Sequence, residues 1–352
     1  MKYLLCILAL LTCAESQAED VLRFYSWKDY FDPGVLEDFQ KARGIRVDYH
    51  AFTTTDELIL AMKNGDAYDV IVPSHFMLRQ LISEGKLAPI DTRRLSNHST
   101  LDPWLLSTLA GIASANQHAV PYLWGSIGMV VNSQLAQPVY GEALPNSWGL
   151  LFDESKAARL ASCGLSMPDA PEESTSLLLN YQGRRLSSAS SRQIGRSLQA
   201  LEVLAPRLRS LDNWEHIDEL ANGRLCLAMS WSGHAIHAME RNPMLTYRIP
   251  EEGAAIYIDT LAIPSNAPNP EHAYDFIDFL IAPKNAIRNA RATKFYAPLA
   301  SSSAEMLTFA KDHPMQVLST EQRRRSYLLE SLKPEQKQAL DQSWEQFKAA
   351  RH

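Results

Sequence analysis

Residues 21–30 read VLRFYSWKDY, and this apolar strand stops at Trp27, Lys28, Asp29 and Tyr30. An aromatic ring attracts a cation through its quadrupole, by about 0.5–2 kcal/mol depending on desolvation. A carboxylate adds a directional, charge-assisted hydrogen bond. Two rings beside a carboxylate, at the end of a strand, therefore predict a site for an organic cation. Lys28 is the one residue of the four that does not fit this chemistry.

The strand opens a series of alternating elements. They are a helix that ends at Gly44, a strand over 45–52, a helix that starts at 55–57 and ends at Gly65, and a short strand over 68–72 that ends at Pro73-Ser74. The β-α-β-α-β order predicts a mostly parallel sheet with helices on both faces. Ligands collect at the carboxyl ends of such strands, where residues 27–30 and Ser74 both lie. The sequence therefore predicts an α/β fold with a ligand site at one edge of the sheet.

Residues 1–18 have the features of a secretory signal peptide. Lys2 is followed by an apolar stretch over 3–12 and by small residues over 16–18, and this stretch is too short to span a membrane. A lipoprotein is the alternative, with Cys13 as the lipidated residue, but a threonine precedes it where Gly, Ala or Ser is usual. No later segment approaches the ~20 apolar residues of a transmembrane helix. We expect a soluble protein exported to the periplasm.

Export leaves two cysteines in the mature chain, Cys163 and Cys226, because Cys6 and Cys13 leave with the signal. An even pair in an oxidising compartment favours one disulfide. Two free buried thiols are the alternative. Two cysteines alone are too few for a structural zinc site, which needs four ligands.

The mature chain has about 334 of the 352 residues, which is too long for one core and predicts two lobes. Its net charge is −6, as for the full chain. No basic block marks a nucleic-acid groove, so we expect no nucleic-acid partner. The acidic balance weakly favours a cationic ligand.

Three later segments supply more aromatic and charged residues. They are LCLAMSWSGH (225–234), AAIYIDTLAIP (254–264) and TKFYAPLA (293–300). Asp259 lies midway along the second segment, where a charge is expensive unless it is paired or faces a cavity. Trp231, Tyr257 and Tyr296 add rings at or near the ends of these segments. Together they predict a site built from both halves of the chain.

Six ordered segments resemble the periplasmic putrescine/spermidine-binding proteins of ABC uptake systems. They are YSWKDY, DVIVPS, AVPYLWGSIGMVVN, SCGLSMPDAPEE, LANGRLCLAMSWSG and GAAIYIDTLAIP. The similarity covers nearly the whole mature chain and is weakest after about Ser301. It implies the type II two-lobe periplasmic binding protein fold, which closes on a polyamine in the cleft between the lobes. The implied first lobe is 19–122 plus 251–285, and the second is 123–250 plus 286–352.

The resemblance also implies roles for individual residues. The implied aromatic box is Trp27, Tyr30, Trp231, Tyr257 and Tyr296. The implied acceptors for ammonium groups are Asp29, Glu173 and Asp259, with Ser74 as a polar contact. Cys163 and Cys226 match cysteines that are disulfide-bonded in the family's putrescine binders. The implied partners are a small amine and an inner-membrane ABC permease, with the protein as a monomer and no cofactor or metal.

Two positions depart from the putrescine binders. Lys28 stands where they carry Ser or Thr, and His234 stands where they carry Asp. One change adds a cation and the other removes an anion, so both weaken attraction for a dication. An altered ligand, an ω-amino acid or an acylated polyamine, is therefore the alternative to a simple polyamine. With an ordinary pKa of ~6.5, His234 would also weaken dication binding in mild acid.

Enzymatic motifs are weak in this sequence. Ser232 lies near His234 but lacks the first glycine of a G-x-S-x-G elbow. No Gly-rich phosphate loop or H-E-x-x-H zinc motif occurs in the sequence. We expect a binding protein and no enzyme. A periplasmic sensor that passes its liganded form to a membrane signalling protein is the alternative to a transport component.

Overall fold

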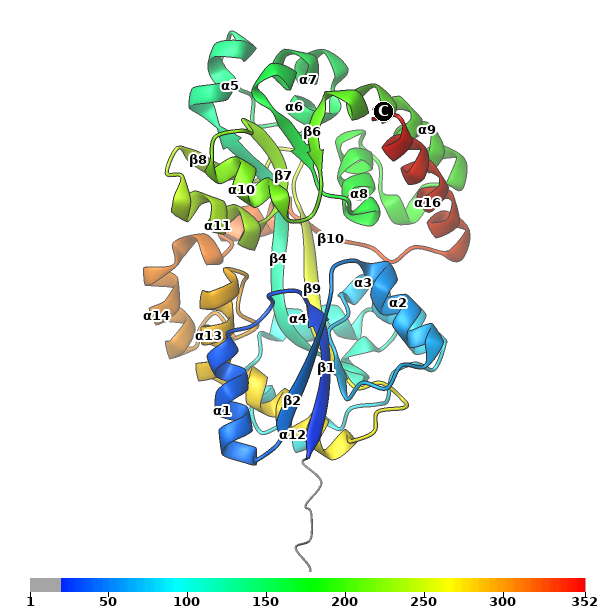
Figure 1. The fold of residues 1–352 in the computed structure, drawn as a ribbon, viewed down its shortest axis with the longest axis vertical. Helices are drawn as coiled ribbons and strands as arrows, with labels where there is room; N and C mark the ends of the chain where they lie inside the picture. The colour runs from blue at the N-terminus through cyan, green and yellow to red at the C-terminus, as the bar shows by residue number, and fades with distance from the viewer. Residues whose placement is uncertain (1–19, 352) are drawn as a thin grey trace, which may run out of the picture.

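The structure is a computed structural model that describes residues 20–351. The predicted signal peptide, residues 1–18, and Cys13 within it lie outside the described residues. Figure 1 shows two lobes, one above the other, and the long strands β4 (Ala119–Asn132) and β9 (Ala255–Ala262) pass between them. The predicted two-lobe α/β architecture is confirmed.

All strands belong to one hydrogen-bonded sheet with the order β2-β1-β3-β9-β4-β7-β5-β6, to which β10 adds on β9 and β8 on β4. Besides β4 and β9 these strands are β1 (Val21–Trp27), β2 (Arg46–Phe52), β3 (Val70–Ile71), β5 (Leu165–Met167), β6 (Leu208–Leu211), β7 (Leu227–Trp231), β8 (Leu245–Arg248) and β10 (Tyr327–Leu328). β1 pairs in parallel with β2 and β3, and β5 pairs in parallel with β6 and β7. The antiparallel pair β4–β9 joins these two parallel halves. The parallel first-lobe sheet predicted from the chain order is therefore confirmed.

Helices cover both lobes. They are α1 (Pro33–Arg43), α2 (Thr55–Asn64), α3 (His75–Ser83), α4 (Pro103–Ala110), α5 (Ser133–Tyr140), α6 (Gly149–Phe152), α7 (Glu154–Leu160), α8 (Pro171–Tyr181), α9 (Ser191–Leu201), α10 (Glu215–Ala221), α11 (Ser232–Arg241), α12 (Pro270–Ile281), α13 (Pro283–Thr293), α14 (Ala304–Asp312), α15 (Thr320–Arg325) and α16 (Pro334–Ala349). In Figure 1, α1, α12 and α13 lie on one side of the lower lobe and α2 and α3 on the other. The C-terminal α16 returns to the upper lobe and lies beside α9.

The ends of the first two helices follow from single residues. The Asp32 side chain accepts a hydrogen bond from the backbone N–H of Gly34 at 2.8 Å and begins α1. Gly44 ends that helix with φ +70°, a left-handed conformation that favours glycine. Thr54 caps α2 in the same way as Asp32 caps α1, and Gly65 ends it with φ +77°. The helix ends predicted from the sequence are confirmed.

Two predicted strands have different limits in the structure. The segment 225–234 is a strand only to Trp231, and α11 begins at Ser232. Ser230, Ser232 and His234 lie around this junction, so hydropathy does not separate the end of the strand from the start of the helix. The segment 68–72 contributes only Val70–Ile71. Tyr296 lies in no named strand and pairs with Trp124 through an isolated bridge.

Cys163 and Cys226 form a disulfide across 63 residues of sequence, with their Cα atoms 5.5 Å apart. Cys226 immediately precedes β7, the strand that ends at Trp231. The predicted disulfide is confirmed, and the alternative of two free thiols is wrong.

The predicted boundaries of the lobes stay a prediction, and the packing of α13 bears on them. Arg288 of α13 forms ion pairs with Asp32 at 3.2 Å and with Asp38 of α1 at 2.6 Å. These contacts hold α13 against the first lobe. They favour a boundary after α13 over the boundary expected between residues 285 and 286.

Candidate functional site

A cavity of about 230 Å³ lies between the lobes. Its walls come from the end of β1, the start of α2, the middle of β9, the first turns of α8 and α11, and the last turns of α16. The predicted side chains that line it are Trp27, Lys28, Tyr30, Ser74, Glu173, Trp231, His234, Tyr257 and Asp259. Residues from both halves of the sequence therefore face one cavity.

Two predicted side chains are not among those that line the cavity. Asp29 is exposed, and its backbone has a left-handed φ of +53°, where the chain turns after β1. Tyr296 is buried beside Trp124, and its hydroxyl lies 3.2 Å from the hydroxyl of Ser126. Its neighbour Phe295 lines the cavity instead. The segment is irregular here: Lys294 has a left-handed φ of +64°, and Tyr296 pairs with Trp124 of β4.

Asp259 is a buried carboxylate held by two hydroxyl groups. Tyr30 donates a hydrogen bond to it at 2.6 Å, and Ser74 donates a second, short one. Burial raises the pKa of Asp259 to about 6, although both hydroxyl donors favour its charged form. Among the residues that the structure describes, no cation pairs with Asp259. It is the mid-strand charge for which the sequence left two alternatives, a paired charge or one that faces a cavity, and it faces the cavity.

Glu173 lies in the first turn of α8 and is buried as well. Burial is the main cause that raises its pKa to about 8, and the neighbouring Glu172 and then Asp259 raise it further. Glu172 forms an ion pair with Lys337 of α16 at 3.1 Å. No such pair is found for Glu173 within residues 20–351. Asp259 and Glu173, the unpaired carboxylates, thus lie within electrostatic reach of each other.

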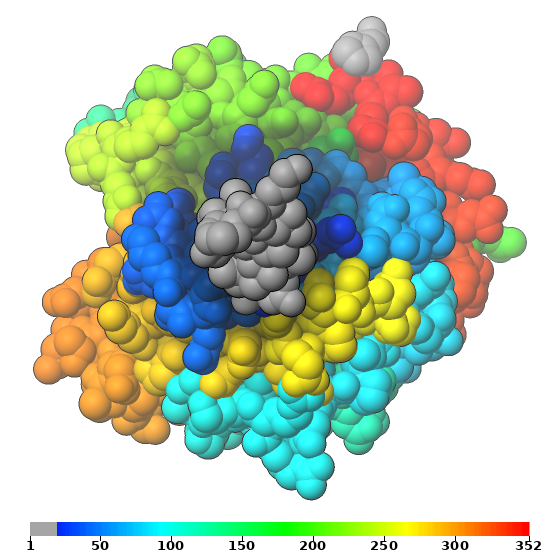
Figure 2. All heavy atoms as spheres, turned by 60° about the horizontal axis from the view of Figure 1, so that its bottom comes forward, coloured from blue at the N-terminus to red at the C-terminus, as the bar shows by residue number. Residues whose placement is uncertain are grey.

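The other acidic groups of the cavity wall are already paired. Lys337 contacts Asp341 at 2.6 Å and Asp56 of α2 at 3.5 Å, in addition to Glu172. A second lysine, Lys348, pairs with carboxylates that belong to Glu345 at 2.6 Å and Asp169 at 3.8 Å. We call these five residues the paired carboxylates. One of these ion pairs, between Lys337 and Asp56, links α16 to α2. Figure 2 shows the red C-terminal segment beside the light-blue segment that contains α2.

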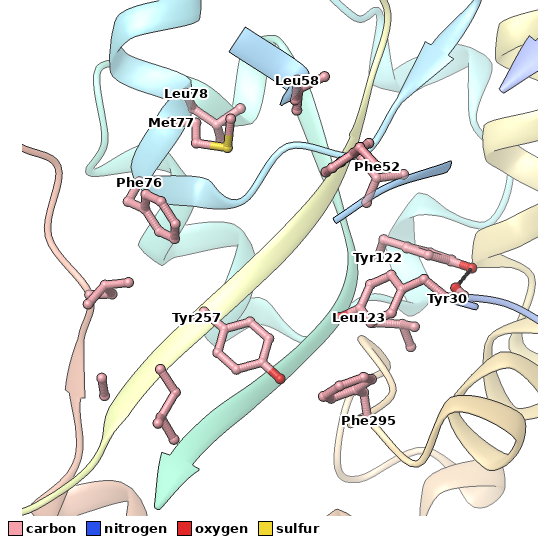
Figure 3. Close-up of a cluster of buried hydrophobic side chains, with 14 of the residues drawn as sticks. Tyr30, Phe52, Leu58, Phe76, Met77, Leu78, Tyr122, Leu123, Tyr257 and Phe295 are labelled. Carbon is pink, nitrogen blue, oxygen red and sulfur yellow. Dashed lines mark hydrogen bonds between the residues drawn. The ribbon is translucent and has the colours of Figure 1, made fainter. Parts of the chain in front are cut away.

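Aromatic rings form the wall between the two lobes. The ring centroid of Phe295 lies 5.1 Å from that of Tyr30 and 6.1 Å from that of Tyr257. Figure 3 shows these three rings around a common space, with Tyr257 projecting from β9. On the second lobe, Trp231 lies 5.4 Å from the ring of His234. Such faces can bury a methylene chain and attract a cation.

Lys28 and His234 both lie close to the ring of Trp214. The Lys28 ammonium nitrogen lies 5.2 Å from the centroid of the Trp214 ring, and the His234 ring lies 4.8 Å from it. Burial, followed by the neighbouring His216 and His237, lowers the pKa of His234 well below 6.5. His234 is therefore neutral at neutral pH and in mild acid. The expectation that His234 would titrate near its ordinary pKa is corrected by this burial.

Trp214 and Phe295 line the cavity but were not singled out from the sequence. Trp214 follows β6 by three residues, so it also lies beyond the carboxyl end of a strand, and the rule that located Trp27 applies to it. For Phe295 and Tyr296 no sequence signal shows which ring faces the cleft.

Within residues 20–351, no group of three or more His, Cys, Asp and Glu side chains is arranged to hold a metal ion. No described helix combines the length and the apolar character that crossing a bilayer requires.

Comparison with known proteins identifies the family. The profile described as bacterial extracellular solute-binding protein matches residues 34–316. The putrescine-binding periplasmic protein SpuD of Pseudomonas aeruginosa (strain UCBPP-PA14) is 31% identical over 348 residues, which cover 96% of this chain and 94% of SpuD. The putrescine-binding periplasmic protein PotF of Escherichia coli (strain K12) is 32% identical over 81% of each chain.

Solved structures agree with the two-lobe fold. The spermidine/putrescine ABC transporter substrate-binding protein PotD from Streptococcus pneumoniae superposes with a TM-score of 0.74 at 25% identity, over 95% of this chain and 100% of PotD. A putative spermidine/putrescine ABC transporter from Listeria monocytogenes gives 0.82 at 24% identity, over 94% and 99%. The relatives support a periplasmic or extracellular location and a binding protein that is not an enzyme. This chain belongs to the bacterial extracellular solute-binding protein family.

Proposed function

We propose that this chain captures a small cationic amine, such as a polyamine, between its lobes, in the periplasm, and presents it as a monomer to an inner-membrane ABC permease. One observation carries the proposal: Asp259 and Glu173 are buried in a ring-walled cavity and have no cationic partner among the described residues. The names of SpuD and PotF, both putrescine-binding periplasmic proteins, support the same ligand class.

The chemistry of the cavity matches an amine. An alkyl ammonium group has a pKa near ~10 and is charged at neutral pH. Its burial is expensive unless carboxylates receive its protons, and Asp259 and Glu173 supply charge-assisted acceptors. The rings of Tyr30, Tyr257 and Phe295 supply apolar faces for the methylene chain.

Both lobes contribute to the site, so a ligand held between them favours the closed arrangement. Asp259 and Tyr30 lie on the first-lobe side, whereas Glu173 and Trp231 come from the second lobe. A closed form recognised by a permease is how we propose that ligand capture leads to uptake. A membrane sensor would read the same closed form. Neighbouring permease and ATPase genes would favour transport, and a neighbouring receptor gene would favour sensing.

Calorimetry on the mature protein tests the proposal. The ligands are putrescine, spermidine, N-acetylputrescine and 4-aminobutanoate, with 1,4-butanediol as a control of the same chain length that has no ammonium group. We expect at least one amine to bind with one-to-one stoichiometry and the diol not to bind. Failure of every amine to bind to folded protein would overturn the proposed function.

A further inference from the structure

We infer that the cleft selects a ligand with a single ammonium group and, at the other end of its alkyl chain, a hydrogen-bond acceptor, either a carboxylate or an acyl carbonyl. The inference rests on the proposed function and narrows the ligand class. Lys28, Trp214 and His234 form the part of the cavity that receives the acceptor, and we call these three residues the lysine end. Asp259 and Glu173 form the carboxylate end.

The balance of unpaired charges is the first argument. Each of the paired carboxylates already forms an ion pair with Lys337 or Lys348. Among the acidic residues of the cavity wall, Asp259 and Glu173 are the ones for which no ion pair is found within residues 20–351. Lys28 lines the same cavity, and its described contact is the ring of Trp214. The cavity therefore offers two acceptor groups for one ammonium and a fixed positive charge of its own.

The two ends are separated by a row of rings. Tyr30, which bonds to Asp259, lies 5.1 Å from Phe295, and Phe295 lies 5.7 Å from His234. The row continues from His234 to Trp214 at 4.8 Å and ends at the Lys28 ammonium, 5.2 Å from the Trp214 ring. The carboxylate end and the lysine end therefore border one continuous wall of rings.

Unpaired donors at the lysine end point to an acceptor group. The indole N–H group of Trp214 is buried without a partner in the described structure, as is Nδ1 of His234. An indole N–H and an ammonium can only donate hydrogen bonds. A second ligand ammonium at this end would leave these donors unsatisfied and would be repelled by Lys28. A carboxylate or carbonyl oxygen would accept from them.

Calorimetry with three ligands of one backbone length tests this inference. Putrescine carries two ammonium groups, N-acetylputrescine carries one and a carbonyl, and 4-aminobutanoate carries one and a carboxylate. The variants are Lys28→Met, which removes the charge, and Lys28→Arg, which keeps it. Lys41→Met is the matched control, because Lys41 lies on exposed α1 away from the cleft and pairs only loosely with Glu37.

We expect wild type to bind at least one of the two acceptor-bearing ligands at least tenfold more tightly than putrescine. Lys28→Met should reduce that preference at least tenfold, whereas Lys28→Arg and Lys41→Met should keep it. The tighter of the two acceptor-bearing ligands identifies the end group. The inference would be overturned if putrescine bound as tightly as both acceptor-bearing ligands and if Lys28→Met left the three relative affinities unchanged. That result would leave the proposed function intact. Failure of all amines would overturn both.

Discussion

The cleft contains two sets of carboxylates, one paired with lysines and one without a cationic partner among the described residues. The paired carboxylates, which include Asp56 and Asp341, are mostly exposed and form ion pairs with two lysines of α16. The unpaired carboxylates, Asp259 and Glu173, are buried and contact hydroxyl groups or other acids instead. Burying a carboxylate without a cationic partner is costly. We therefore expect the unpaired carboxylates to bind a cation that the chain itself does not supply. The comparison shows that acidity alone does not mark a cation site, and that the state of pairing does.

The largest effect is expected for Asp259→Asn, because this change removes a buried acceptor of the ligand ammonium. We expect the affinity for the best amine to fall by roughly 2–5 kcal/mol, a typical loss for one partner of a buried charge pair. Calorimetry measures the loss, with Asp48→Asn as the charge control, because Asp48 is a half-buried residue of β2 that does not line the cavity. An affinity within threefold of wild type would show that Asp259 is not the acceptor.

Reduction of the Cys163–Cys226 disulfide tests the second-lobe wall of the cleft. The bridge closes 63 residues and holds the start of β7, which carries Trp231. We expect the free energy of unfolding to fall by about 2–4 kcal/mol. Amine affinity should fall less than in Asp259→Asn, because the unpaired carboxylates lie on other elements. A denaturation midpoint that does not change with reductant would contradict this prediction.

Acidity should weaken amine binding through Glu173. The pKa of Glu173 is raised to about 8 in the free protein, so this carboxyl holds its proton at pH 7. A bound ammonium favours the ionised form, so binding releases a proton and affinity rises with pH up to about 8, by at most about tenfold per unit. Titrations in buffers of different ionisation enthalpy measure the proton released. Glu173→Gln should abolish the slope between pH 7 and 8, and a slope that persists in this variant would assign it to another group.

The smallest effect is expected for Asp56→Asn, the direct counterpart of Asp259→Asn. Asp56 is an exposed partner of Lys337, and Lys337 keeps Glu172 and Asp341 after the change. Exposed ion pairs contribute about 0–1 kcal/mol, so the amine affinity should change by less than about fivefold. Calorimetry under the conditions used for Asp259→Asn provides the comparison. Equal losses in the two variants would remove the distinction between paired and unpaired carboxylates.

Much of the site follows from one sequence rule, that ligand groups lie at the carboxyl ends of strands. The rule located Trp27, Ser74 and Trp231, and the cost of a mid-strand charge located Asp259. All of these side chains line the cavity. They were accessible to sequence analysis because a strand fixes where its own end lies and which way its side chains alternate.

The other features of the site, namely which neighbouring side chain faces the cleft and which carboxylates are paired, depend on three-dimensional geometry that the local sequence does not determine. Whether Lys28 or Asp29 faces the cleft is decided by a left-handed turn at Asp29 after the strand has ended. The choice between Phe295 and Tyr296 depends on how an irregular segment meets β4. The pairing of the acidic groups depends on α16, whose sequence lies beyond Ser301, where the resemblance is weakest.

A crystal structure of the mature protein with the amine that binds most tightly tests the central claim most directly. The account predicts the ligand in the cleft, with its ammonium nitrogen about 3 Å from carboxylate oxygens of Asp259 and Glu173. An acceptor at the other terminus should lie toward Lys28. An amine found outside the cleft, or one whose ammonium contacts the paired carboxylates and leaves Asp259 and Glu173 without a partner, would contradict it.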